Sequence, residues 1–443
     1  MNNTMKHSLL ALAVAAGISP LAMADTVGDQ AESKGFVKDS SLDLLLRNYY
    51  FNRDGKNGSG DRRDWTQGFI ATYQSGFTQG TVGFGVDAFG YLGLKLDGGK
   101  GTTGTGNLPV DNDGSPEDDY GHAGGALKVR VSKTLLKWGE MQPTAPVFAA
   151  GGTRLIPQTA RGFHLLSSEL DGLDLEAGHF TAGNGPTTTS SRGELYATYA
   201  NVTADSVDFV GGNYALTDNL SVSLYGSEFE DIWRQYYANA NYVLPLADDQ
   251  ALGFDFNIYR TNDEGRAEAG EISNTTWSLA ASYSFLAAHK VTLAYQKVHG
   301  DTPFDYIGFG DNGPGAGGDS IFLANAIQYS DFNGPNERSW QARYDLDMQP
   351  YGVPGLSFMA RYANGRGIDG TDMAADSPYR DYGYGEDGKH HETNLEAKYV
   401  VQTGPAKDLS LRIRQAWHRG NTDQAESDHD EFRLIVDYPL SIL

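Results

Sequence analysis

Three features are scarce or missing in this 443-residue chain. It contains no cysteine, which excludes a disulfide framework. After the first 24 residues no segment approaches the roughly 20 apolar residues that a membrane-spanning helix needs, and the mean hydropathy is only -0.44. Basic residues are also in deficit, since 34 Lys and Arg face 57 Asp and Glu for a net charge of -23. That balance argues against a nucleic-acid partner, because phosphate binding needs a basic surface.

The N-terminus has the pattern of a secretory signal peptide. Lys6 precedes an apolar run over 9–18, and Ala22–Ala24 fits an A-x-A cleavage site. We therefore expect 1–24 to be removed on export and 25–443 to form one domain. Two classes remain, a soluble exported protein and a transmembrane β-barrel, because a barrel places its apolar residues at every second position, where average hydropathy does not reveal them.

Strict alternation of apolar and polar residues runs through the chain and is typical of half-buried strands. In 251–260, Leu252, Phe254, Phe256 and Ile258 alternate with polar or small residues. The same pattern recurs over 80–88, 126–132, 275–285, 339–348 and 431–440. A soluble β-sandwich would also alternate, but two features favour the barrel. Aromatic residues gather at the ends of the apolar faces, and charged residues occupy the opposite face in mid-strand, as a water-filled lumen allows.

The connecting segments differ greatly in length. Short turns near 217–219 and 286–290 alternate with long Gly- and Asp-rich stretches over 96–121, 308–320 and 367–389. Short periplasmic turns and long extracellular loops are the expected arrangement of an outer-membrane barrel. At about 20 to 25 residues for each strand and its connection, the chain predicts an all-β, antiparallel barrel of about 16 to 20 strands, which is wide enough for a channel.

Several long segments resemble one protein family closely. They include SSLDLLLRNYYFNRDG, GGALKVRVSKTLLKWGEMQPTAPVFAAGGTRL, RGELYATYA, TLAYQKVHGDTPFDYIGFG and EFRLIVDYPLSIL. These segments are similar to the porin D (OprD-type) family of gram-negative outer-membrane porins, and the similarity covers the whole mature chain. The resemblance implies a monomeric, eighteen-stranded barrel, embedded in outer-membrane lipid and lipopolysaccharide and narrowed by loops folded into its lumen.

The resemblance also implies a function and a set of site residues. The expected function is passive uptake of small carboxylate-bearing solutes, above all basic amino acids such as arginine or lysine, basic peptides and carbapenem-type antibiotics. The family's ladder of basic side chains along one pore wall corresponds here to Arg53, Arg62, Arg154, Lys398, Arg412, Arg414 and Arg433. Its acidic and aromatic constriction pocket corresponds to Tyr199, Tyr306 and Asp331.

Strand parity gives an independent prediction for part of this set. Lys398, Arg412, Arg414 and Arg433 each alternate with apolar neighbours and should face the lumen, whereas Arg154 lies in a proline-containing stretch expected to fold inward. Successive guanidinium groups could pass a carboxylate from site to site; alternatively, they could merely pair with lumen acids such as Glu396 and Asp437. Tyr199 shares the parity of Leu195 and Ala197, which would direct it toward lipid unless a bulge resets the phase.

Other functions find less support. A porin for other carboxylates is the main alternative, and the family has also been classed with serine-type peptidases, through residues that correspond to His179, Asp231 and Ser320. No preorganised catalytic site is evident among these three. The G-x-G-x-x-G match at 383–388 lacks the strand and helix of a nucleotide site. His390, His391 and Glu392 are adjacent and should point apart if on a strand, so we expect an exposed loop end, with no metal site or cofactor.

A cluster of acids in one long segment is the remaining candidate for an ion site. Asp111, Asp113, Glu117, Asp118 and Asp119 could loosely hold divalent ions at the cell surface, although their spacing is not that of an EF-hand.

Overall fold

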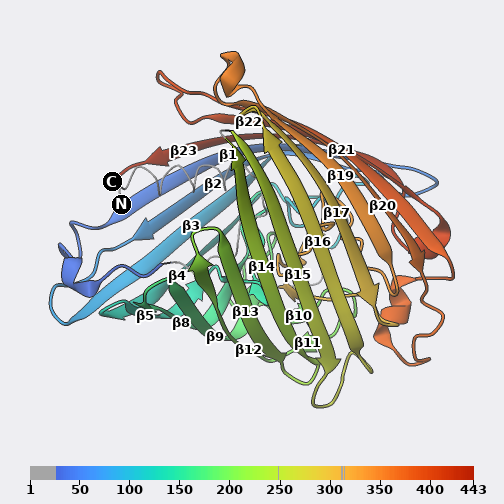
Figure 1. Cartoon of the computed structure of the whole chain (residues 1–443), viewed down its shortest axis with the longest axis horizontal. Helices are drawn as coiled ribbons and strands as arrows, with labels where there is room; N and C mark the ends of the chain where they lie inside the picture. The colour runs from blue at the N-terminus through green and yellow to red at the C-terminus, as the bar shows by residue number, and fades with distance from the viewer. Residues whose placement is uncertain (1–25, 248, 311–312, 314) are drawn as a thin grey trace.

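The computed structural model describes residues 26–443 except 248, 311–312 and 314, so the predicted signal peptide at 1–24 lies outside the described residues. Eighteen antiparallel strands form one sheet, in which each strand pairs with the next along the chain. The first strand, β1, pairs with β2 on one side and with the last strand, β23, on the other, and this closes the barrel (Figure 1). The predicted fold class and strand number are therefore confirmed.

The wall strands are long enough to cross a membrane at a tilt. Most wall strands have 10 to 15 residues. They are β1 Ser41–Gly55, β2 Arg62–Gln74, β3 Val82–Gly98, β4 Asp119–Val131, β5 Thr134–Met141, β8 Thr159–Leu170, β9 Leu173–Asn184, β12 Val207–Thr217, β13 Leu220–Phe229, β14 Trp233–Ala247, β15 Gln250–Asp263, β16 Ser273–Phe285, β17 His289–His299, β19 Arg338–Asp347, β20 Leu356–Ile368, β21 Gly388–Val400, β22 Ser410–Gly420 and β23 His429–Ser441. No helix among the described residues is long and apolar enough to cross a membrane.

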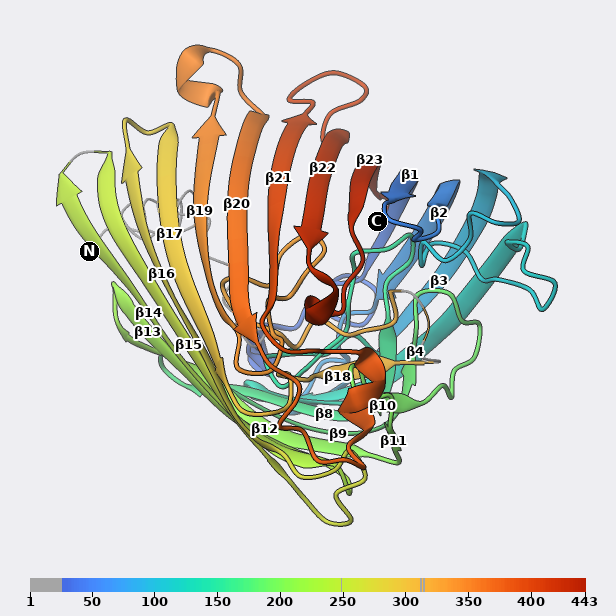
Figure 2. The same cartoon turned by 90° about the vertical axis from the view of Figure 1, so that its right-hand side faces the viewer.

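Shorter elements lie in the connections between wall strands. Among the described residues these are β6 Thr144–Ala145, β7 Phe148–Ala149, β10 Leu195–Ala197, β11 Thr203–Ala204 and β18 Ile307–Phe309, with the 3-10 helices η1 Gln30–Glu32, η2 Gln349–Tyr351, η3 Pro378–Tyr382 and η4 Thr422–Gln424. Strands β11, β10 and β18 form a small sheet of their own. Figure 2 shows this sheet inside the barrel, so the loops that carry it occupy the lumen.

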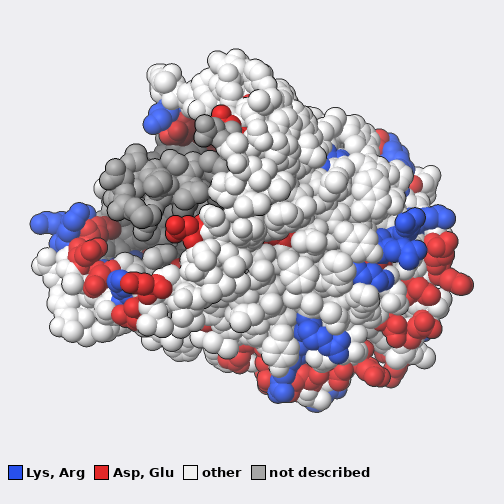
Figure 3. Space-filling view, viewed as in Figure 1, with Lys and Arg blue, Asp and Glu red and all other residues white. Residues whose placement is uncertain are grey.

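The apolar side chains of the wall strands point outward. On β15, Phe254 and Phe256 are 37% and 36% exposed, whereas Asn257, on the opposite parity, is only 4% exposed. On β4, Leu127 is 54% exposed and its neighbour Lys128 only 6%. Figure 3 shows an outer wall almost free of charged side chains over β14–β16, with Lys, Arg, Asp and Glu gathered toward its edges. The predicted phase of the alternation is confirmed.

The two ends of the barrel have connections of different length. At one end, strands are joined by two residues at 132–133, 171–172 and 218–219, and by three at 286–288. At the other end, five connections are long enough to fold inward, and they join β3 to β4, β5 to β8, β9 to β12, β17 to β19 and β20 to β21. The long end is the predicted extracellular end.

An apolar core holds the inward-folded loops against the wall. The Phe148 ring, from the β5–β8 loop, lies 5.0 Å from the ring of Phe180 on β9 and 5.0 Å from that of Phe309 on β18. All three side chains are fully buried. Because burying one such ring contributes roughly 1.5–3 kcal/mol, this cluster fixes three separate chain segments relative to one another inside the barrel.

Candidate functional site

Three residues from two inward-folded loops meet at one carboxylate. Tyr199 comes from the β9–β12 loop, and Tyr306 and Asp331 come from the β17–β19 loop. The Tyr199 hydroxyl donates to Oδ2 of Asp331 at 2.9 Å, and the Tyr306 hydroxyl donates to the same oxygen at 2.8 Å. The two rings meet edge to face with centroids 6.0 Å apart. The structure thus brings together all three residues of the predicted constriction pocket.

The two loops are held together by Asp305, a residue that the sequence analysis missed. Its carboxylate accepts backbone N–H bonds from Tyr199 at 3.0 Å, Ala200 at 3.1 Å and Tyr306 at 2.7 Å. Asp305 is only 3% exposed, and a buried carboxylate is tolerated when several N–H groups donate to it. Asp305 therefore positions both tyrosines from behind.

Strand parity left the orientation of Tyr199 open, and the structure places its side chain in the lumen against Asp331. Parity with Leu195 and Ala197 would place Tyr199 against lipid if these residues belonged to a wall strand. They belong instead to β10, which pairs with β11 and β18 inside the lumen and is buried on both faces. An alternating pattern identifies a strand but does not say to which sheet the strand belongs.

Burial changes the acidity of both loop carboxyls. Burial raises the pKa of Asp331 to about 6, although the hydrogen bonds from Tyr306 and Tyr199 favour its charged form. Burial likewise raises the pKa of Asp305 to about 7, against the opposing effect of three backbone hydrogen bonds. A lumen carboxyl with a pKa near 6 changes charge within the range of pH that a bacterium meets outside its cell.

The basic residues of the wall lie on four neighbouring strands. Arg53 is on β1, Arg433 on β23, Arg412 and Arg414 on β22, and Lys398 on β21. In the sheet register, Arg414 lies directly opposite Arg433, and Lys398 lies directly opposite Arg412. Because directly opposed residues have Cβ atoms about 4.5–5.5 Å apart, four of these side chains form a continuous row, and Arg53 joins it through Glu431, which lies directly opposite Arg53 and pairs with both Arg53 and Arg433. We call them the basic row.

Two glutamates are interleaved with the basic row. Glu431 pairs with Arg53 at 2.5 Å and with Arg433 at 2.6 Å. Glu396 pairs with Arg412 at 2.7 Å and with Arg414 at 3.2 Å. Four guanidinium groups therefore share two carboxylates, and the row keeps a net positive charge. The alternative that lumen arginines pair with lumen acids is thus present in the geometry, but the two carboxylates balance only two of the five positive charges of the row.

The remaining predicted basic residues lie at the edge of the row. Arg62 on β2 is directly opposite Arg53, and its guanidinium donates to the carbonyl oxygen of Gly104 at 3.3 Å. Arg154, in the β5–β8 loop, lies with its guanidinium carbon 5.9 Å from the Phe51 ring centroid. Across the described ranges, neither of these residues nor Lys398 forms an ion pair with an acid. Each is therefore a cation without a fixed acidic partner.

The pore wall also carries basic side chains that were not among the predicted residues. Arg343 on β19 and Arg361 on β20 lie directly opposite each other. With Lys290 on β17 they line the lumen, and a cavity of about 700 Å³ is bounded by Lys290, Arg343, Glu396 and Lys398. The same inward parity that identified the basic row would have found Arg361, because its neighbours Ala360 and Tyr362 face outward.

Comparison with known proteins identifies the family. A family model described as outer membrane porin, OprD family, matches residues 34–442. The chain belongs to the OprD family of porins. This porin is 77% identical over 441 residues to Porin D of Pseudomonas aeruginosa, with 99% of each chain covered. It is 38% identical over 429 residues to the porin-like protein GalP of Pseudomonas putida, covering 96% of this chain and 98% of that one.

Solved structures agree with the barrel described above. The crystal structure of OprD from Pseudomonas aeruginosa is similar with a TM-score of 0.84 and 71% identity, covering 94% of this chain and 99% of that one. The crystal structure of Pseudomonas aeruginosa OpdK with vanillate is similar with a TM-score of 0.82 and 37% identity, covering 92% and 100%. This porin is therefore an outer-membrane channel, as the signal peptide, alternation and resemblance predicted.

The structure does not bring the three peptidase-type residues of this porin into one site. His179 on β9 is half exposed and interacts with Asp208 at 2.9 Å. Asp231 forms an ion pair with Arg266 at 2.8 Å at the β13–β14 turn. Ser320 is fully buried in the β17–β19 loop, and its hydroxyl has no hydrogen-bond partner in the described chain. A serine nucleophile needs a base within hydrogen-bond reach, and neither His179 nor Asp231 serves Ser320.

The expectation of an exposed loop end at 390–392 is wrong. His390 lies on strand β21 and is 4% exposed, and Glu392 is fully buried. Both point inward, while the His391 ring contacts Tyr362 on the outward parity. The preceding G-x-G-x-x-G match at 383–388 leads from η3 into β21 and is the predicted loop.

Proposed function

We propose that this porin is a passive uptake channel for small solutes that carry both a carboxylate and a positive charge. Basic amino acids such as arginine and lysine, together with basic peptides, are the expected solutes, and carbapenem-type antibiotics share the carboxylate. The observation that carries this proposal is the coexistence of a net-positive row and an acidic, aromatic pocket in one lumen. A solute with two opposite charges matches both.

One loop segment connects the two charged features. Arg433 donates to the carbonyl oxygen of Gln328 at 3.2 Å, and the Arg53 guanidinium lies 4.7 Å from the centre of the Tyr329 ring. Asp331 follows only two residues later in the same loop. Three residues span at most about 11 Å, so the row and the pocket lie within the reach of one small extended molecule.

The basic row suits the passage of a carboxylate better than its tight binding at one site. A guanidinium can hold a carboxylate through two parallel hydrogen bonds, and the next guanidinium along the row offers an equivalent site. Glu431 and Glu396 compete with the solute for these donors, which keeps each site shallow. Conduction requires binding that is favourable enough to enter and weak enough to leave.

The cationic end of the solute has its own partners. Tyrosine rings and a carboxylate attract an ammonium or guanidinium group, and Tyr199, Tyr306 and Asp331 supply both. The net charge of -23 lies mostly in loops and lumen, where its field draws cations toward the mouth. We expect the mature domain 25–443 to act as a monomer surrounded by outer-membrane lipid and lipopolysaccharide, with no cofactor and no enzymatic activity.

A porin for other carboxylates is the second candidate. The relative solved with vanillate, at 37% identity, indicates that the family fold accommodates an aromatic carboxylate without a positive charge. The pocket at Asp331 discriminates between the two candidates, because its carboxylate attracts arginine and repels benzoate.

Planar-bilayer recording on purified protein tests the proposal. Arginine should interrupt or carry current at lower concentrations than glucose or benzoate, because it alone satisfies both charged features. Replacing Asp331 by Asn should reduce the preference for arginine over benzoate. Equal permeation of arginine, benzoate and glucose by the parental channel would contradict the proposed selectivity.

A further inference from the structure

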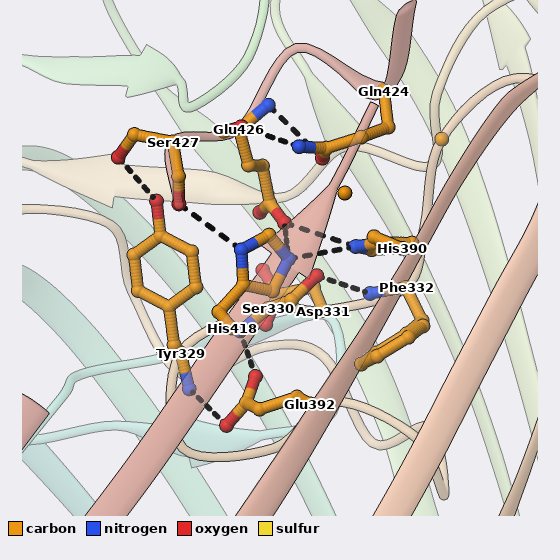
Figure 4. Close-up of polar contacts among 12 residues, drawn as sticks. Tyr329, Ser330, Asp331, Phe332, His390, Glu392, His418, Gln424, Glu426 and Ser427 are labelled. Carbon is orange, nitrogen blue, oxygen red and sulfur yellow. Dashed lines mark hydrogen bonds and ion pairs between the residues drawn. The ribbon is translucent and has the colours of Figure 1, made fainter. Parts of the chain in front are cut away.

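Two buried histidines and one glutamate converge at the extracellular side of the lumen. His390 comes from β21, His418 from β22 and Glu426 from the loop between β22 and β23. His390 Nδ1 lies 2.9 Å from His418 Nε2, and one carboxylate oxygen of Glu426 lies 3.4 Å from the first and 3.3 Å from the second. Figure 4 shows the two rings and the carboxylate pointing at a common centre.

The outer nitrogen of each ring, the one that points away from the other ring, already forms a hydrogen bond. His418 Nδ1 lies 3.0 Å from the carbonyl oxygen of Ser427, which can only accept, so Nδ1 carries the proton. His390 Nε2 lies 2.8 Å from the Glu337 carboxylate, which accepts a hydrogen bond, so Nε2 likewise carries a proton. With both outer nitrogens protonated, the inner nitrogens face each other and the Glu426 oxygen, so that a proton or a metal ion must lie among these three atoms.

Three lone pairs that converge in a buried site repel one another unless a cation lies between them. We propose that His390, His418 and Glu426 form a binding site for a divalent transition-metal ion of the zinc class. Imidazole and carboxylate ligands suit such ions, and the outer hydrogen bonds to Glu337 and Ser427 match those that commonly orient metal-binding histidines.

The distances fit the proposal. Zinc lies about 2.0–2.1 Å from nitrogen and oxygen ligands in a tetrahedral site, so its ligand atoms are about 3.3 Å apart. The three observed separations are 2.9, 3.3 and 3.4 Å, and a shift of a few tenths of an ångström would complete the geometry. With two histidines and one glutamate, the fourth position would take water. Entry is from the loop side, where the Glu426 side chain is 12% exposed and both histidines are covered.

The metal would tie the wall to the loop that forms the constriction. The Phe332 ring packs 4.2 Å from the His390 ring, and Glu337, the partner of His390, ends the same β17–β19 loop. Asp331 lies next to Phe332. Metal binding at this site would therefore stabilise the loop that carries the constriction carboxylate, whichever solute the channel conducts.

Calorimetric titration with Zn²⁺ on the full chain, purified in detergent without a histidine tag, tests the site. Excess Mg²⁺ in every sample occupies surface clusters of carboxylates, which prefer that ion. We expect one Zn²⁺ for each chain. His390→Asn or His418→Asn should weaken binding by at least about 100-fold, which is more than loss of an outer partner causes, and Glu426→Gln should weaken it at least about 10-fold.

His391→Asn is the matched control, because it changes the same residue type one position along β21 but on the outward face. It should bind Zn²⁺ as the parental protein does. Zn²⁺ should also raise the melting temperature of the parental and His391→Asn proteins more than that of Glu426→Gln, whose loop position leaves the wall intact. Absence of Zn²⁺ binding by the parental protein, or equal binding by the His390→Asn and His391→Asn proteins, would overturn the proposal in favour of a proton shared between the two rings.

Discussion

Tyr306 donates its hydroxyl hydrogen to Oδ2 of Asp331 at 2.8 Å, and Tyr199 donates to the same oxygen. The other carboxylate oxygen, Oδ1, receives no hydrogen bond from the described chain. The tyrosines thus hold the carboxylate in place through one oxygen and leave the second available. We expect Oδ1 to be the atom that meets the ammonium or guanidinium group of a solute.

Cation selectivity should depend on pH through Asp331. Its pKa is raised to about 6 by burial, so the carboxylate is charged above that pH and becomes neutral as the pH falls through it. The permeability ratio of K⁺ to Cl⁻, measured from reversal potentials in a KCl gradient, should therefore decrease between pH 7 and pH 5. Arginine flux should decrease over the same interval.

Two variants distinguish the effect of Asp331 titration on selectivity from that of the other titrating groups of the channel. Asp331→Asn should remove the step near pH 6 and leave low cation selectivity throughout. Tyr306→Phe removes a hydrogen bond that favours the charged form, so it should raise the pKa of Asp331 and move the step to higher pH. An unchanged step in Asp331→Asn would assign the pH dependence to a different group.

The wall of the barrel was predictable because period-2 alternation records which face meets lipid. Phe254, Phe256 and Asn257 have the predicted orientation for that reason. The lumen was less predictable. Leu195 and Ala197 carry the same alternation as a wall strand but belong to a small internal sheet, since a strand buried against other loops can also be apolar.

The site residues were predictable where the family resemblance gave their positions in the sequence. They were not predictable where a residue's role depends on contacts between distant segments of the chain. Tyr199, Tyr306 and Asp331 meet as expected. By contrast, the role of Asp305 could not be read from the sequence, because it depends on two backbone N–H groups from a loop about 100 residues away, besides that of its neighbour Tyr306. The proximity of His390 and His418 likewise follows from strand register, which places Glu392 opposite His418, and register is not encoded in either strand alone.

Single cysteines can test the orientation of β15 without interference, because the chain has none of its own. A cysteine at position 256 should resist charged, water-soluble maleimides in liposomes and react with lipid-soluble ones. A cysteine at position 255, which lines the lumen, should show the reverse preference. Aqueous labelling at 256 together with lipid-phase labelling at 255 would reverse the phase of the barrel wall.

Replacing Ser320 by Ala should leave both folding and transport intact. The hydroxyl is fully buried and makes no hydrogen bond in the described chain, so its removal loses no favourable contact and should change the free energy of unfolding by less than about 1 kcal/mol. Purified parental protein should show no peptide hydrolysis that the substitution removes. A hydrolysis rate that exceeds that of a mock preparation and disappears in Ser320→Ala would restore the peptidase hypothesis.

The double replacement of Arg412 and Arg414 by Gln tests the basic row directly. Arg412 is 39% exposed and Arg414 15% exposed, so both contact solution in the lumen. An exposed ion pair contributes only about 0–1 kcal/mol, but a charge-assisted contact in the narrow pore could reach about 1.5–3 kcal/mol. Arginine flux should therefore decrease severalfold or more. Barrel stability should barely change, because Gln remains solvated and can still donate to Glu396.

The control for charge is Arg234→Gln with Arg266→Gln, which removes the same two positive charges from exposed positions, 51% and 72%, at the rim. This rim variant should alter arginine flux far less than the row variant. The control for pore size is glucose, whose flux should be the same in all three proteins. If the row variant carries arginine at the parental rate, or loses arginine and glucose in equal proportion, the arginines are structural partners of Glu396 and do not guide the solute.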